Sequence, residues 1–321
     1  MKIDAMALLR KEFPFTLDVQ SDYVKEFIKE FPNNAVHQKN MQELSSKGDN
    51  YIERCLLKEI VSFLSQLGYD ESCEYFAAIT NSFSASMQDG EEKIIVLDDS
   101  FNTGLMEFYL LIMVWADILE DTDNFEYCMS NMIFLLDMHC IKKKLGTIDP
   151  CKDKHWFKKV KGNIQEIAAD CYWVSWCFMV LHELGHLVLG HTKLTGSIEH
   201  EFDADKFAYD IVLKLIEKNH KSDKEGLSVF KEYTCFAPVM MLNFYKVIDS
   251  FQELVYEESS YYFKPEPQER IDKLLETEIE GFDISTGNDV YNIHLEVVDL
   301  FFEQLKTKYE KGKLEGLKDF N

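Results

Sequence analysis

Residues 181–191 read LHELGHLVLGH, and the polar side chains in this apolar stretch decide how the chain is interpreted. Apolar residues recur at spacings of three and four over 156–190, which predicts a helix. Leu and Val surround His182, Glu183 and His186, so this helix is expected to be buried. Buried polar side chains need partners, because an unpaired charge is costly there. The histidines are therefore either metal ligands or core side chains capped by the neighbouring carboxylate.

The spacing of the two histidines favours a metal. At about 100° per residue, His182 and His186 project about 40° apart on one face, and Glu183 lies to the side of them. Imidazoles at i and i+4 can share one tetrahedral Zn²⁺ at about 2.0–2.1 Å, while the adjacent Glu can reach a water beside the metal. The stretch therefore predicts a zinc site with His182 and His186 as ligands and Glu183 as general base.

A catalytic zinc site needs one further protein ligand and one open position. A second amphipathic helix is predicted over 199–219, with Ser197 as its N-cap. The candidates for the third ligand are His191, Glu199, His200, Glu201 and Asp203. His191 is alternatively a histidine at the C-terminal end of the first helix, where the helix dipole favours a cation.

Glu201 has the best context among these candidates. It shares one face with Ala204, Asp205 and Ala208, and the alanines allow a close approach to another helix. Asp205 can then accept the second N–H of a ligating imidazole, the alternative being a solvent-facing charge. The metzincin pattern HExxHxxGxxH is excluded, because Gly190 comes one residue late and Thr192 occupies the position of the third His.

Together, HELGHLVLGH and EFDADKFA (201–208) resemble the gluzincin pattern HExxH…ExxAD/N of ImmA/IrrE-like peptidases, HtpX-type and prenyl-processing zinc peptidases, and the phage-exclusion peptidase Lit. This resemblance covers about 181–210. It implies that His182, His186 and Glu201 bind zinc and that Glu183 is the catalytic base. It also implies that Asp205 hydrogen-bonds to one of the zinc-binding histidines.

A second segment, KPEPQERIDKL (264–274), is similar to the HPxxxxR-I/L element of HtpX-like enzymes. Pro265 and Arg270 match that element, whereas Lys264 replaces its His. The candidates for holding the oxyanion are Lys264, Tyr261 and Tyr262, and Arg270 either joins them or fixes the loop through a carboxylate. The alternative for all four is an ordinary surface or packing role.

Composition limits the kind of partner. The 321 residues carry a net charge of -23, which disfavours nucleic acid and anionic membranes, and no secretory signal or membrane span is predicted. The eight cysteines are scattered, so we expect reduced thiols and a cytosol-like compartment. The lack of a predicted span separates the chain from HtpX and the prenyl-processing enzymes, and its layout resembles a soluble Lit-type or ImmA-like host-defence or regulatory protease.

The expected fold is mainly α (α+β), with a zincin-like helical core and a small sheet or hairpin before the active-site helix. NSFSASM-QDGE-EKIIVLD predicts the hairpin across 81–97, with a turn at Asp89-Gly90. The Lys93–Leu97 strand is expected to offer an edge to an extended substrate. Helices are predicted near 21–31, 52–67, 103–120, 124–144, 156–190, 199–219, 226–257, 267–278 and 289–311.

The domain organisation is expected to be a helical region over 1–150 and a catalytic region over 151–321, either separate or integrated into one domain. Eight lysines lie between residues 142 and 161, around a loop marked by Gly and Pro. This loop is either a solvated connection or a docking patch for an acidic partner.

These observations predict a zinc-dependent endopeptidase that cleaves an intracellular protein or peptide, in phage defence or regulation, with activation by a partner protein or peptide. Lit-type resemblance suggests a translation factor as substrate, and ImmA-like resemblance suggests a repressor. The alternative is a zinc-binding regulatory protein without proteolytic activity, whose metal site would be closed by four protein ligands.

Overall fold

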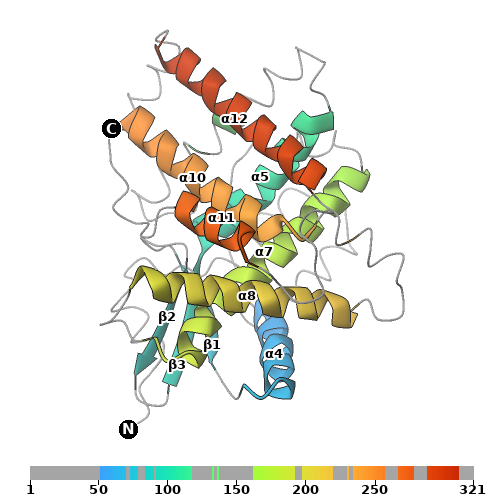
Figure 1. Cartoon of the computed structure of the whole chain (residues 1–321), viewed down its shortest axis with the longest axis vertical. Helices are drawn as coiled ribbons and strands as arrows, with labels where there is room; N and C mark the ends of the chain where they lie inside the picture. Colours follow the sequence, from blue (N-terminus) through green and yellow to red (C-terminus); the bar gives the residue numbers. More distant parts are fainter. Residues whose placement is uncertain are drawn as a thin grey trace, which may run out of the picture.

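A computed structural model of the chain describes residues 51–69, 73–78, 84–89, 92–117, 132–133, 136, 162–191, 197–219, 230, 234–256, 267–277 and 288–310. The elements in chain order are α4 (Tyr51–Gln66), β1 (Glu74–Ala78), β2 (Ser84–Asp89), β3 (Glu92–Asp98), α5 (Asp99–Asp117), α7 (Gly162–Val188), α8 (Ile198–Asn219), α10 (Ala237–Tyr256), α11 (Pro267–Leu275) and α12 (Asn288–Glu310). The predicted class is confirmed: the protein is mainly helical, with a small sheet that precedes α7 in the chain (Figure 1).

Most of the predicted helices are confirmed within a few residues, but the one expected over 226–257 is shorter. Helix α10 begins at Ala237, because Cys235 and Phe236 form a turn before it. The Tyr209 hydroxyl donates a hydrogen bond of 2.9 Å to the carbonyl of Cys235, so a contact from α8 fixes this turn. The predicted helix over 21–31 and most of the one over 124–144 lie outside the described residues.

Strand β3 lies in the middle of a three-stranded sheet of order β1-β3-β2. The predicted hairpin is confirmed as β2 and β3, which pair antiparallel. Its register places Asp89 opposite Glu92, so Asp89 ends the strand and does not belong to the turn. Gly90 and Glu91, which connect the two strands, lie outside the described residues.

The prediction that Lys93–Leu97 offers a free edge is wrong. Strand β1 pairs with β3 in parallel on the side that β2 leaves open. The apolar side chains of β3 from Ile94 to Leu97 are fully buried, as is typical of a central strand. The sequence of β1 gave no hairpin signal, because a parallel partner is not joined to its neighbour by a short turn.

Helix α7 lies at the centre of the packing, in contact with α5, α8, α10, β2 and β3. In Figure 1, α8 crosses the molecule between the group formed by the sheet and α4 and the group formed by α10, α11 and α12. The hydroxyl of Tyr109 lies 2.6 Å from both Ser175 Oγ and the carbonyl oxygen of Ala237, which joins α5, α7 and α10 through buried hydrogen bonds. These contacts make α7 a fixed support for the side chains of its last turns.

One hydrophobic core includes residues of α4 and α5 as well as residues of α7, α8, α10 and α12. It therefore joins elements from both sides of residue 150, which itself lies outside the described residues, as does the lysine-rich loop. None of the helices in the described ranges is long and apolar enough to cross a membrane. The cysteines in the described residues form no disulfide with one another: Cys55, Cys73, Cys171, Cys177 and Cys235.

Candidate metal centre

Helix α7 ends just after the HELGH motif in a turn that requires glycine. Gly190 has a φ of 70°, a left-handed conformation that glycine adopts without steric cost. Its N–H donates to the carbonyl of Leu187 at 3.3 Å, and the His191 N–H donates to the carbonyl of His186 at 2.9 Å. This pair of bonds is a Schellman motif. The chain therefore turns back, and His191 lies next to His186.

Helix α8 crosses α7 at close range beside the motif. Ala204 and Ala208 are fully buried, and a Cβ added to Gly185 would lie 3.3 Å from the Ala204 Cα. The close approach predicted from the alanines is thus present. Ser197 is the N-cap of α8, since its Oγ accepts the His200 N–H at 3.3 Å. The first turn of α8 brings Glu201 over the two histidines.

Three side chains converge at this crossing. The Nε2 atoms of His182 and His186 are 3.1 Å apart. The Glu201 carboxylate oxygens lie 3.3 Å from His182 Nε2 and 3.5 Å from His186 Nε2. Among the described residues these three side chains form a group that could hold a metal ion. The side chain of Glu201 is 27% exposed, against 6% for His182, so the group opens to solvent on the side of α8.

The donor set fits a tetrahedral zinc ion. Ligand atoms at about 2.0–2.2 Å from a tetrahedral metal lie about 3.3–3.6 Å from one another, close to the separations in this group. Two imidazole nitrogens and a carboxylate are all acceptors when the histidines are neutral. Acceptors repel one another at such distances unless a cation lies between them. The site is thus arranged for a cation with N and O ligands.

Asp205 holds His182 from behind. Its Oδ1 lies 2.9 Å from His182 Nδ1, so the ring's proton is on Nδ1 and its other nitrogen faces the group. Arg270, on α11, donates two hydrogen bonds to the same carboxylate, from Nε at 2.8 Å and from Nη2 at 2.6 Å. Asp205 is 2% exposed, which rules out a solvent-facing charge. Of the two arrangements considered for Arg270, the structure has the one in which it binds a carboxylate.

The charges around the group favour a bound cation. Burial lowers the pKa of His182, but the charge and hydrogen bond of Asp205 outweigh it and, with Glu201, raise that pKa to about 10. Burial raises the pKa of Glu201, yet hydrogen bonds from His182 and His186 hold it well below its usual range. A proton and a metal ion compete for the same lone pair, so metal binding at neutral pH releases protons.

Glu183 is 4% exposed and lies one residue after the first ligand. Its carboxylate forms no hydrogen bond or ion pair with the residues that the structure describes, in contrast to Glu201 and Asp205. A carboxylate that neighbours a candidate metal site and is not engaged by other side chains is available to exchange a proton with water or substrate.

Residues 142–281 match the family model described as Peptidase U49. This part of the chain is a Peptidase U49 domain. The match confirms the resemblance to the Lit peptidase and spans α7, α8, α10 and α11. Neither a curated protein nor a solved structure gave a significant match to the chain.

The remaining candidate residues of the U49 domain take different places. Glu199 and Asp203 are exposed on α8, away from the group that Glu201 completes. The ring of His200 stacks on that of His191, with centroids 4.1 Å apart and planes at 8°. Lys264, Tyr261 and Tyr262 lie outside the described residues, so their roles stay predictions.

Sequence reasoning missed one contact in the U49 domain. His191 Nδ1 lies 3.1 Å from His186 Nδ1, whereas the sequence offered His191 only as a ligand or as a dipole partner. The signal was the Gly190-His191 pair at the end of the helix, which is typical of a Schellman motif. Burial, together with His200 and His186, lowers the pKa of His191, which favours the form of the ring that accepts a hydrogen bond.

Substitution of Gly185 by Val is expected to separate α7 from α8. An added Cβ would lie 3.1 Å from Phe207 Cδ1 and 3.3 Å from the backbone of Ala204, and Val adds two further methyl groups. We expect a loss of about 1–3 kcal/mol in the free energy of unfolding, from overpacking, together with weaker zinc binding. Urea unfolding and zinc titration measure both. Glu166→Val, at an exposed site on the same helix, is the control for helix propensity, and equal effects of the two variants would contradict the close crossing.

Proposed function

We propose that the chain is a zinc-dependent endopeptidase that cleaves a protein substrate. One observation carries the proposal: within a peptidase domain, His182, His186 and Glu201 bring three acceptor atoms to the spacing of a tetrahedral zinc ion. Glu183 is adjacent and has no partner among the described residues. The choice of zinc rests on the N/N/O donor set and on the HExxH spacing.

In this proposal each side chain has a separate task. A bound zinc ion supplies Lewis acidity that polarises the scissile carbonyl and lowers the pKa of a nearby water. Glu183 accepts a proton from the attacking water and delivers it to the amine of the leaving fragment. Asp205 keeps the proton of His182 on Nδ1, and Arg270 holds Asp205 ionised and in place.

Support for the oxyanion is proposed to come from the segment that precedes α11. Arg270 already directs two N–H groups at Asp205, which makes it a positioning residue. Tyr262 and Lys264 remain the proposed donors, since they precede α11 by a few residues in the chain.

Two features favour a peptidase over a zinc-binding regulator without activity. A structural zinc site is closed by four protein ligands, whereas the described group has three. Burial of the Glu183 carboxylate without a partner among the described residues costs free energy. A purely structural zinc site gives no reason for this cost, whereas a catalytic site needs such a carboxylate as its base. For an extended substrate we propose β2, which lies against α7 and pairs within the described sheet only with β3.

The resemblance to the Lit peptidase supports a role in defence against phage or in regulation, with an activating protein or peptide as partner. On this proposal the purified protein has little activity alone and gains activity when extract from infected cells is added. A translation factor and a repressor are the two substrate classes that the resemblances suggest.

Mapping of protein N-termini in cells tests the proposal directly. Cells that express the wild-type chain, with and without phage infection, are compared with cells that express Glu183→Gln at equal levels. We expect new N-termini inside one or a few proteins, present with the wild type and absent with the variant. Identical sets of N-termini in all samples would overturn the peptidase assignment.

A further inference from the structure

His186 has a polar partner on the side opposite to the metal group. Its Nδ1 lies 3.1 Å from the Nδ1 of His191, and the two rings are inclined at 65° with centroids 5.2 Å apart. A contact of this length between two ring nitrogens is a hydrogen bond only when one carries the proton and the other offers a lone pair. The pair therefore has a direction.

The geometry on the other side of His186 sets this direction. Its Nε2 faces His182 Nε2 and the carboxylate of Glu201, so coordination there needs a lone pair on Nε2. The proton of the neutral ring is then on Nδ1, which donates to His191. Asp205 plays the equivalent part for His182 at 2.9 Å. Each histidine of the group thus has its own acceptor.

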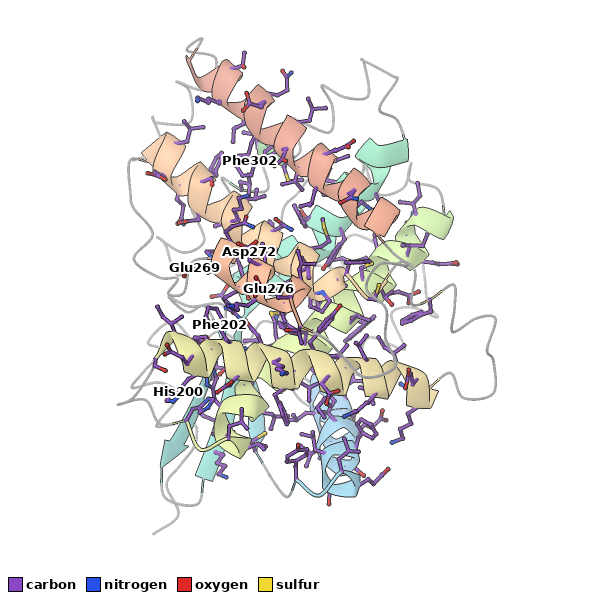
Figure 2. All side chains as sticks on the ribbon, in the orientation of Figure 1. His200, Phe202, Glu269, Asp272, Glu276 and Phe302 are labelled. Carbon is purple, nitrogen blue, oxygen red and sulfur yellow. The ribbon has the colours of Figure 1, made fainter. Side chains whose placement is uncertain are left out.

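Two contacts hold His191 in place, and neither involves the Nε2 atoms of His182 and His186 or the carboxylate of Glu201. The Schellman motif at Gly190 fixes its backbone, because the His191 N–H donates to the carbonyl of His186 at 2.9 Å. Its ring stacks on His200, with planes at 8°. Figure 2 shows His200 on the first turn of α8, where it directly precedes Glu201 in the sequence. The stack therefore joins the end of α7 to the part of α8 that carries the third ligand.

We infer that His191 is a positioning residue of the metal centre: its Nδ1 accepts the Nδ1–H of His186 and so directs the lone pair of His186 Nε2 at the bound ion. The inference rests on the proposed function, because it assumes that His182, His186 and Glu201 bind zinc. It assigns His191 to orienting a ligand, in contrast to the ligand and helix-dipole roles that the sequence suggested.

Two substitutions of His191 distinguish the effect of its hydrogen-bond acceptor from the effect of its aromatic ring. His191→Phe keeps an aromatic ring for the stack on His200 but removes the acceptor. His191→Asn loses the ring but places an amide oxygen at the same number of bonds from Cβ as Nδ1. His294→Phe, at a histidine on α12, is the matched control for loss of an imidazole elsewhere.

The dissociation constant for zinc is measured for the full-length wild type and the three variants by competition with a chromophoric chelator at one pH. We expect His191→Phe to bind zinc about 10–100-fold more weakly than the wild type, because loss of a hydrogen-bond partner of a metal-binding histidine typically lowers metal affinity by that factor. His191→Asn is expected to bind within a few-fold of the wild type, and His294→Phe to match it. Far-UV circular dichroism and thermal unfolding of the metal-free proteins report any change in folding separately.

The outcomes distinguish this inference from the proposed function. If the wild type binds zinc and His191→Phe binds it with equal affinity, the role of His191 is overturned and the metal site is not. A larger loss in His191→Asn than in His191→Phe would also overturn it, since the ring and not the acceptor would then matter. A wild type that binds no zinc would overturn the proposed function itself.

Discussion

The Glu183→Gln protein is expected to bind zinc as tightly as the wild type and to cleave its substrate about 10²–10⁴-fold more slowly. Gln has nearly the same shape as Glu but cannot accept the proton of the attacking water. The carboxylate of Glu183 is not among the three groups that converge on the metal position, so its loss leaves the ligands in place. The measurement is kcat/KM on a peptide that spans a cleavage site mapped in cells.

The control for this substitution is Glu59→Gln, which makes the same chemical change at an exposed site on α4. We expect it to leave both zinc content and kcat/KM unchanged. Cleavage by Glu183→Gln at the wild-type rate would show that another group acts as the base. A parallel loss of zinc would show instead that Glu183 belongs to the metal-binding group.

The Asp205→Ala protein is expected to be less stable by about 3–5 kcal/mol in its free energy of unfolding. Arg270 has a side chain that is only 14% exposed, and in this variant its charge would lose the carboxylate that binds it in two places. Removal of one partner of a buried ion pair is costly because the other charge stays buried and unpaired. Urea unfolding of the chelator-treated protein measures this effect without a contribution from bound metal.

Asp210→Ala provides the matched control on the same helix. Asp210 pairs with Lys214 at 2.6 Å, but both side chains are exposed, so we expect a change of about 0–1 kcal/mol. The double variant Asp205→Leu/Arg270→Met removes both charges and is expected to be more stable than Asp205→Ala. Equal losses for Asp205→Ala and Asp210→Ala would contradict the assignment of a buried, rigid pair.

Much of the metal centre could be predicted from the types of residue and their spacing in the sequence. The i and i+4 histidines predicted one shared metal position because the helix repeat brings them to one face. Glu201 stood out because small residues next to it permit a close crossing, and Gly185 on the facing helix meets Ala204 as that idea requires. Local rules sufficed here because each depends on neighbours within one or two turns.

Other features depend on contacts that spacing does not encode. The pairing of Arg270 with Asp205 joins residues 65 positions apart, and no local pattern selects that partner. The position of β3 between two strands depends on β1, whose parallel pairing leaves no turn signal. The start of α10 at Ala237 was hidden because apolar residues continue through the turn before it, where Tyr209 binds the carbonyl of Cys235.

The most direct test of the metal site combines elemental analysis with anomalous diffraction at the zinc edge on crystals of the full-length protein. We expect about one zinc per chain and a single strong peak bonded to His182 Nε2, His186 Nε2 and a carboxylate oxygen of Glu201, at about 2.0–2.2 Å from each. Protein without stoichiometric metal, with no peak at that position and Glu201 turned away from the histidines, would contradict the account.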